Sequence, residues 1–175
     1  MSIYVIIKIS SYFMVPYLLY NIGSHGPLIL YLLSCYFLWK KKTLYFYYNI
    51  GFLIDTILNI ILKGILQQPR PSADIKQFNL AITNGKRFVF KDGVPFDLFG
   101  MPSGHAQSTF FSTVFMYYSM KNERILQIYL FITLLTMCQR VVYNFHTLLQ
   151  VVVGGMIGSI FGYFIYYQSQ KKLAE

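Results

Sequence analysis

Charged residues are scarce in this chain of 175 residues: Asp, Glu, Lys and Arg together make up only 12% of it. Hydrophobic residues make up 55%, and the mean hydropathy is positive. A soluble protein of this length could not cover so much apolar surface with so few charges. The composition therefore excludes an ordinary soluble globular protein. The length is enough for one domain and short for two, so we expect residues 1–175 to form a single domain.

Cysteine is also scarce, and its two copies, Cys35 and Cys138, both lie inside apolar runs. We expect them to be buried as small hydrophobic side chains, neither joined in a disulfide nor bound to a metal. The chain has no low-complexity tract and no internal repeat, and no small-residue cleavage pattern follows its first apolar run. An uncleaved first helix is therefore the expected membrane-targeting signal.

Acidic residues number only six against fifteen Lys and Arg, which gives a formal net charge of +9. In a soluble protein this excess would point to nucleic acid. Here the basic residues cluster at the ends of apolar runs, where anionic lipid attracts them. We therefore expect membrane lipids as partners, and no nucleic acid.

What the chain does have is a series of long apolar runs rich in Tyr and Phe, with 16 of each. Aromatic rings near the ends of such runs are typical of membrane–water interfaces. The pattern predicts an all-α, polytopic transmembrane bundle with about four to six spans and one polar active-site loop. The expected helical segments are 1–22, 26–39, 44–66, 103–120, 125–142 and 147–167.

The first run is the least certain of these segments, because Lys8, Ser10, Ser11 and Pro16 interrupt it. It is expected to be a tilted span or an interfacial helix. The Gly- and Pro-containing segment 21–27 is expected to break it. His25 then lies in a loop without catalytic work.

Polar and small residues inside the runs predict how the helices pack. Asp55 and Asn59 are four residues apart, so they share one helical face and should hydrogen-bond inside the bundle. Small-xxx-small patterns within 154–162 favour close helix packing. Within the polar stretch 72–100, segments 88–90 and 94–96 predict a small hairpin. A loop of this length is often a lid or a binding loop.

The basic residues divide between two membrane faces. The cytoplasmic face, by the positive-inside rule, receives Lys40–Lys42, Lys121, Arg124, Lys171 and Lys172. The opposite face receives Lys63, Arg70, Ser103, His105, Arg140 and His146. The second group consists of residue types that bind and transfer phosphate, so we expect a phosphate site there.

The chemistry of the second group supports that expectation. Arginine grips two phosphoryl oxygens at once, and lysine supplies a point charge. Ser103-Gly104-His105 opens a helix, so free N–H groups and the helix dipole point toward an anion. Of the two histidines, one could attack phosphorus and the other protonate the leaving oxygen. Gln150 lies one turn after His146 and can fix its tautomer.

Three motifs carry a family resemblance. Residues 63–71 read KGILQQPRP, residues 102–105 read PSGH, and residues 140–146 read RVVYNFH. They resemble, in order, the KxxxxxxRP, PSGH and SRxxxxxHxxxD motifs of the type 2 phosphatidic acid phosphatase superfamily. The core motifs fall within 44–168. QQPRP, FGMPSGHAQS and FHTLLQVVVGG are most similar to the dolichyl-diphosphatase branch.

The resemblance implies a role for each matching residue. Phosphate binding would fall to Lys63, Arg70, Ser103, Gly104 and Arg140. His105 would be the acid for the leaving group, and His146 the nucleophile that forms a phosphohistidine. No metal or other cofactor is implied. The substrate would be a polyisoprenyl diphosphate, cleaved at the lumenal face of the endoplasmic reticulum.

Two positions depart from the family pattern: Gln139 replaces the usual Ser, and Gln150 replaces the usual Asp. Members of the dolichyl-diphosphatase branch also carry His-Thr-x-x-Gln, so Gln150 is a feature of that branch; Gln139 has no such explanation. One alternative is a phosphatase of phosphatidate or another lipid monophosphate. A second is a catalytically silent membrane scaffold or lipid-binding protein, because Gln150 removes the carboxylate partner of His146.

Overall fold

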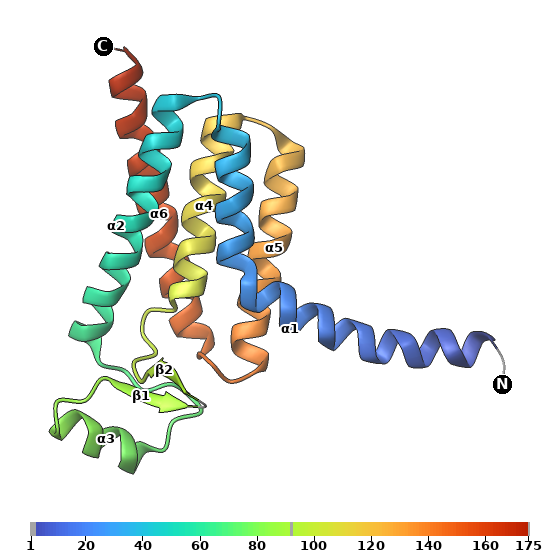
Figure 1. Cartoon of the computed structure of the whole chain (residues 1–175), viewed down its shortest axis with the longest axis vertical. Helices are drawn as coiled ribbons and strands as arrows, with labels where there is room; N and C mark the ends of the chain where they lie inside the picture. Colours follow the sequence, from blue (N-terminus) through green and yellow to red (C-terminus); the bar gives the residue numbers. More distant parts are fainter. Residues whose placement is uncertain (1–2, 92, 175) are drawn as a thin grey trace.

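The computed structural model describes residues 3–91 and 93–174, with the side chains of 3–15, 18, 91, 94 and 95 left aside. Its elements are α1 (Ile3–Leu38), α2 (Lys42–Leu66), α3 (Ile75–Thr83), β1 (Phe88–Lys91), β2 (Val94–Asp97), α4 (Gly104–Met120), α5 (Glu123–Val142) and α6 (Leu148–Ala174). The expected helical bundle is confirmed (Figure 1).

Three helices, α2, α5 and α6, are long and apolar enough to cross a bilayer. This count covers the described residues alone, and α1 and α4 complete the helical bundle. α4 has 17 residues and carries buried Thr109, Ser112 and Thr113, which it can do because it is packed against α1, α2, α5 and α6. The chain is thus an integral membrane protein whose central helix carries buried polar side chains.

Glycines bring α6 against the backbone of α4. A Cβ atom on Gly154 would lie 2.5 Å from the carbonyl oxygen of Ser103, and one on Gly162 would lie 2.6 Å from that of Phe111. A Cβ atom on Gly158 would collide with the carbonyl of Gln107. The close packing expected from the small-residue pattern is confirmed, and it places the start of α6 beside the start of α4.

α2 contributes polar side chains to the interior of the bundle. Asn59 donates to Gln107 Oε1 at 2.8 Å, and Gln107 Nε2 donates to Asp55 Oδ1 at 2.9 Å. Aromatic rings fill the neighbouring core, with Tyr48 packed against Phe115 at 5.3 Å between centroids. The interior hydrogen bonding predicted for Asp55 and Asn59 is confirmed.

The predicted break at 21–27 is wrong, because α1 runs through it as one helix that bends away from the bundle (Figure 1). Gly23 packs on Gln139 of α5 and Gly26 on Thr136, so these glycines serve helix contact rather than a turn. Pro27 lies within the helix, as proline can in membrane helices. His25 is therefore helical, with Nδ1 2.8 Å from the carbonyl of Asn21.

The cysteines also differ from expectation. Both are free, but Cys138 is exposed and Cys35 is only partly buried. Cys138 lies on α5, one of the three apolar helices, whose outer surface suits lipid rather than water. An apolar run in a membrane protein thus does not predict burial within the protein itself.

The stretch 72–100 is more structured than a loop. Asp74 caps α3, accepting from the N–H groups of Lys76 and Gln77. The predicted hairpin is confirmed: β1 and β2 are antiparallel, with Phe88 opposite Asp97. α3 itself was not predicted, because nine residues give too few turns for a clear periodic signal.

Candidate active site

The residues of the three motifs meet at one end of the bundle, beside the hairpin (Figure 1). Lys63 lies in the last turn of α2 and Arg140 in the last turn of α5, while Ser103 precedes α4 and His146 precedes α6. The charges of Arg70, Lys63 and Arg140 lie close enough to act on the rings of both His105 and His146. The lysines of 40–42 and Lys121 lie together at the other end of the bundle.

Asp97 links the cations of this site to the hairpin. Its Oδ2 lies 3.5 Å from Lys63 Nζ and 3.0 Å from Arg87 Nη2. Its backbone carbonyl accepts from Arg70 Nε at 2.9 Å. Burial alone would raise the pKa of Asp97, but the hydrogen bond from Arg87 and the charge of Lys63 outweigh it, so the pKa is lowered.

Neither Asp97 nor Arg87 was predicted from the sequence. They were two of several charged residues in 72–100, and nothing in the spacing indicated which of these would turn inward. In the structure, Asp97 and Arg87 form an ion pair that positions the hairpin. Arg87 also donates to the carbonyl of Ile60 at 3.0 Å, so the hairpin is fastened to the last turns of α2.

His146 is held by a backbone carbonyl. Its Nδ1 lies 2.8 Å from the carbonyl oxygen of Gly100 and 3.2 Å from Gln150 Oε1, both of which can only accept. Nδ1 therefore carries the proton. Its Nε2 faces Arg70 Nη1 at 3.2 Å, and since arginine can only donate, Nε2 presents its lone pair.

The surroundings of His146 keep its ring neutral. Burial, and then the positive charges of Arg70 and Lys63, lower the pKa of His146 to about 3. Burial likewise lowers the pKa of Arg70, and the charge of Asp97 opposes this effect. The site thus combines an unprotonated imidazole nitrogen with fixed cations, as a nucleophile for an anionic phosphoryl group requires.

Gln150 is fixed by both ends of its amide. Nε2 donates to the carbonyl of Pro69 at 2.9 Å, while Oε1 accepts from the N–H of Thr147 at 3.2 Å. This directs Oε1 toward His146. Gly100 has to lack a side chain here, because a Cβ atom would lie 2.7 Å from Gln150 Oε1.

The start of α4 has unused hydrogen-bonding capacity. Within the described part of the chain, Ser103 Oγ and Arg140 Nε are buried with no hydrogen-bond partner. Ser103 makes no side-chain cap, so the first-turn N–H groups of α4 remain available. A side chain on Gly104 would crowd Asn59 Oδ1, at 2.9 Å from its Cβ. These orphaned donors suit an anion.

His105 is oriented by α1. Its Nε2 lies 3.1 Å from the carbonyl oxygen of Ser24, which makes Nε2 the donor. Each site histidine therefore has one ring nitrogen bonded to a main-chain carbonyl. Sequence reasoning missed this contact because it treated Ser24 as part of a helix break.

Gln139 now has a structural setting. Its side chain packs against Gly23 of α1, and both amide atoms are buried without a partner among the described residues. It fills space between α1 and α5, and its amide forms no hydrogen bond with His105 or His146.

Comparison with known proteins gives consistent matches. The PAP2 superfamily model matches residues 44–174. The chain is 32% identical over 122 residues to dolichyldiphosphatase of Saccharomyces cerevisiae, covering 64% of this chain and 46% of that protein. It is 31% identical over 120 residues to lipid phosphate phosphatase epsilon 2, chloroplastic, of Arabidopsis thaliana, covering 64% and 35%. It thus spans less than half the length of these relatives.

The fold has a solved counterpart in the crystal structure of Aquifex aeolicus LpxE. The TM-score is 0.66 at 20% sequence identity, covering 88% of this chain and 86% of that one. At this identity the likeness concerns the arrangement of the helices. It agrees with the bundle described above.

Proposed function

This chain belongs to the PAP2 superfamily, and on that basis we propose that it is a membrane phosphatase that hydrolyses the terminal phosphate of a polyisoprenyl diphosphate. The observation that carries the proposal is the state of His146: a neutral ring with Nδ1–H bonded to Gly100 and Nε2 facing Arg70. The similarity to a dolichyldiphosphatase supports the substrate class.

In the proposed first step, His146 Nε2 attacks the terminal phosphorus. A P–N bond forms while the bond to the bridging oxygen breaks, and the leaving polyisoprenyl phosphate takes a proton from His105, which enters this step as the doubly protonated imidazolium. In the second step, water attacks the phosphorus of the phosphohistidine, the P–N bond breaks, the now neutral His105 accepts a proton from the water, and inorganic phosphate leaves. Because Ser24 occupies Nε2 of His105, Nδ1 is the nitrogen that exchanges this proton.

The remaining site residues stabilise the charge of the phosphoryl group. Arg70, Arg140 and Lys63 supply fixed positive charge, and the Ser103 hydroxyl with the first-turn N–H groups at Gly104 supplies hydrogen bonds. In the described structure Arg70 lies against His146, so a bound phosphoryl group takes the place of that contact. No metal is required in this scheme, because these cations supply the positive charge.

Gln150 keeps its proposed role as a positioning residue. A carboxylate is the usual partner that orients a catalytic histidine. Here the Gly100 carbonyl accepts the Nδ1 proton, and Gln150 Oε1 lies beside it. The alternative of a catalytically silent scaffold is therefore weaker. Although position 150 carries no carboxylate, the Nδ1 proton of His146 still has an acceptor.

We further propose that residues 1–175 form one phosphatase domain, that it resides in the endoplasmic reticulum, and that the active site faces the lumen. The lipid chain stays in the bilayer while its head group reaches the basic end of the bundle. The product would return the lipid carrier to protein N-glycosylation. Phosphatidate phosphatase activity is the alternative, supported by the similarity to a lipid phosphate phosphatase.

The deciding experiment measures phosphate release by the purified protein in detergent containing EDTA. Dolichyl diphosphate and phosphatidate are compared, with His146→Ala as the blank. Preference for the diphosphate that is lost in the variant supports the proposal. Preference for phosphatidate keeps the mechanism and replaces the substrate. Release from neither substrate contradicts the enzyme assignment and favours the scaffold.

A further inference from the structure

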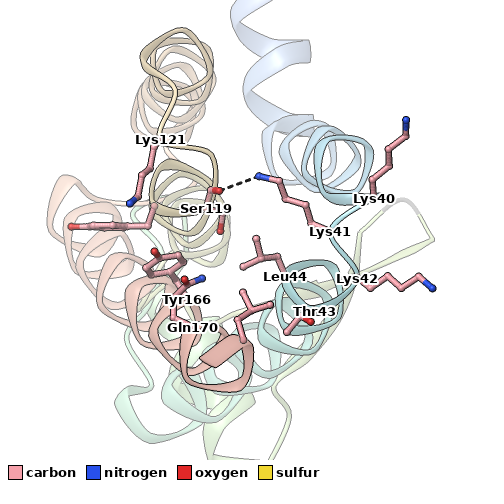
Figure 2. Close-up of a pocket in the computed structure, with 11 residues that line it drawn as sticks. Lys40, Lys41, Lys42, Thr43, Leu44, Ser119, Lys121, Tyr166 and Gln170 are labelled. Atoms are coloured by element: carbon pink, nitrogen blue, oxygen red, sulfur yellow. Dashed lines mark hydrogen bonds between the residues drawn. The ribbon is translucent and has the colours of Figure 1, made fainter. Parts of the chain in front are cut away.

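A second basic site lies at the end of the bundle opposite the candidate active site. A pocket of about 550 Å³ opens between the α1–α2 turn and the ends of α4 and α6 (Figure 2). Lys40, Lys41, Lys42 and Lys121 line it. It shares no residue with the phosphate site, so the mechanism proposed above gives it no role.

The positive charge of this pocket is not neutralised within the described part of the protein. Its lining there contains no Asp or Glu, and Asp97, which pairs with Lys63 and Arg87, lies at the other end. Lys41 reaches across to the carbonyl of Ser119 and to Met120 Sδ, each at a long 3.4 Å. These contacts with neutral atoms leave the ammonium charge available to an anion.

Two lysines face the hollow from opposite walls. Figure 2 shows Lys41 extending toward Ser119 and Lys121 on the α4 side of the hollow, while the side chains of Lys40 and Lys42 point outward from it. Lys121 has a left-handed backbone, with φ of 48°, at a helix end where glycine is usual. A long cationic side chain is thus placed where a small residue would be easier to accommodate.

The pocket also contains polar groups that are able to hydrogen-bond to a ligand. Ser119 lines the pocket, and its hydroxyl is buried without a partner among the described residues. Thr43 and Gln170 add further polar groups to the lining. Several lysines with neutral donors match the oxygens of a phosphate group.

The remaining lining indicates a lipid. Leu44 and Leu173 give the pocket apolar walls, and Tyr118 and Tyr166 give it aromatic ones. The pocket lies at the ends of α2 and α6, two of the helices apolar enough to cross a bilayer. Tyrosine at this level is typical of the membrane interface. A head group with phosphates and an attached apolar part fits both halves of the lining.

We propose that this pocket binds the phosphorylated head group of an anionic membrane lipid, in the leaflet opposite the phosphatase site. The head group carries a phosphomonoester, since clustered lysines favour an anion of higher charge than a phosphodiester. This differs from general attraction of basic residues to a membrane surface, because it predicts that position within the pocket matters, not charge alone.

Trp39, the one tryptophan of the chain, supplies a local reporter. It directly precedes Lys40 and is 70% exposed. The protein is placed in phosphatidylcholine nanodiscs that contain phosphatidylinositol bisphosphate with brominated acyl chains, and quenching of Trp39 fluorescence is measured. Because Trp39 lies at this end of the bundle, lipid bound at the phosphatase site does not quench it.

Paired variants separate the pocket from the surface around it. Lys41→Gln with Lys121→Gln removes two charges from the pocket. Arg124→Gln with Lys171→Gln removes two charges from the same membrane face outside the pocket. We expect the lipid concentration for half-quenching to rise about tenfold more in the pocket variant than in the control, because the general attraction per basic residue at an anionic membrane is the same for both pairs. Thermal unfolding of each variant checks that the fold is kept.

Three results would overturn the proposal. Equal weakening in both double variants would reduce the effect to diffuse surface charge. Equal quenching by brominated phosphatidylserine at matched total charge would remove the preference for phosphomonoesters. Displacement of the lipid by free inositol trisphosphate at the same concentration would show that the acyl part adds nothing, and would make this a site for soluble phosphates.

Discussion

The carbonyl oxygen of Gly100 lies 2.8 Å from Nδ1 of His146, closer than the 3.2 Å that separates this nitrogen from Gln150 Oε1. The shorter contact comes from the main chain, so side-chain substitution at 150 does not abolish it. Gln150 supports the same ring while binding Pro69 through its other amide atom.

His146→Ala is expected to abolish phosphate release and to leave no trapped phosphoenzyme, because the attacking nitrogen is gone. Mass spectrometry of the acid-labile phosphoprotein after rapid mixing checks the intermediate. His105→Ala should retain the phosphoenzyme on substrates with good leaving groups and lose most activity on poor ones. Wild-type turnover in His146→Ala would contradict the nucleophile assignment.

Gln150→Asp is expected to lower turnover about tenfold or more, although it restores the usual carboxylate. The shorter carboxylate cannot donate to the Pro69 carbonyl, and it adds a buried negative charge beside His146. Gln150→Glu removes the donor and adds the same charge but keeps the side-chain length, so comparing the two variants isolates the effect of length. Steady-state kinetics on both variants decide the question; faster turnover in Gln150→Asp would mean that the native glutamine is a defect.

The tautomer of His146 can be observed directly. Nitrogen NMR of histidine-labelled protein in detergent should show one ring that is neutral and protonated on Nδ1 from pH 8 down to about pH 5. The resonance is assigned by its loss in His146→Asn. A ring that becomes charged between pH 6 and 7 would contradict the lowered pKa.

The same lowered pKa predicts how stability depends on pH. The folded pKa of His146 is about 3, below the unfolded value near 6.5, so only the unfolded chain takes up a proton in that interval. The free energy of unfolding should therefore decrease as the pH falls through this window, by up to about 1.4 kcal/mol per pH unit from this residue. Denaturation of wild type and His146→Asn at several pH values isolates the contribution.

Asp97→Asn is expected to destabilise the protein by about 2–4 kcal/mol, since it leaves Lys63 and Arg87 without their carboxylate. Because the pKa of Asp97 is lowered, its contribution is present above the usual aspartate range and is lost in acid. Glu123→Gln, at the other end of the bundle, is the charge-matched control. Thermal unfolding that is equal in both variants would show that Asp97 does not anchor the hairpin.

Gly158→Ala should destabilise the bundle by about 1–3 kcal/mol, because the added methyl collides with the carbonyl of Gln107 on α4. Gly64→Ala is the matched control: its nearest neighbour is Arg87 Nη1 at 3.7 Å, so the helix accepts it or gains slightly. Thermal unfolding in detergent compares the two. Equal stability would mean that α4 and α6 tolerate a wider separation.

Sequence reasoning predicted the parts of this molecule that have a periodic or compositional signal. The apolar runs located α2, α5 and α6, and the gathering of Lys63, Arg70 and Arg140 at one end followed from the alternation of faces. The hairpin followed from its turn residues. These features depend on side-chain type, which a sequence displays.

The features that were missed are of two kinds. Some depend on main-chain atoms, and others depend on which of several similarly charged residues turns toward the site. Nothing in the residue Gly100 indicates that its carbonyl will meet His146, and nothing in Ser24 indicates the same for His105. Asp97 had competitors of equal charge in the same stretch. Gly23 and Gly26 carried a turn signal, but packing against α5 decided their conformation.

The contact between His105 and Ser24 has a consequence for how the boundaries of this protein are drawn. The family match begins at residue 44, whereas Ser24 belongs to α1, which ends at Leu38. A chain trimmed to the matched region would keep every motif residue and discard the oxygen that orients one of them. For biochemical work and for transplanting the site into another protein, the smallest working unit therefore extends beyond the stretch recognised by similarity.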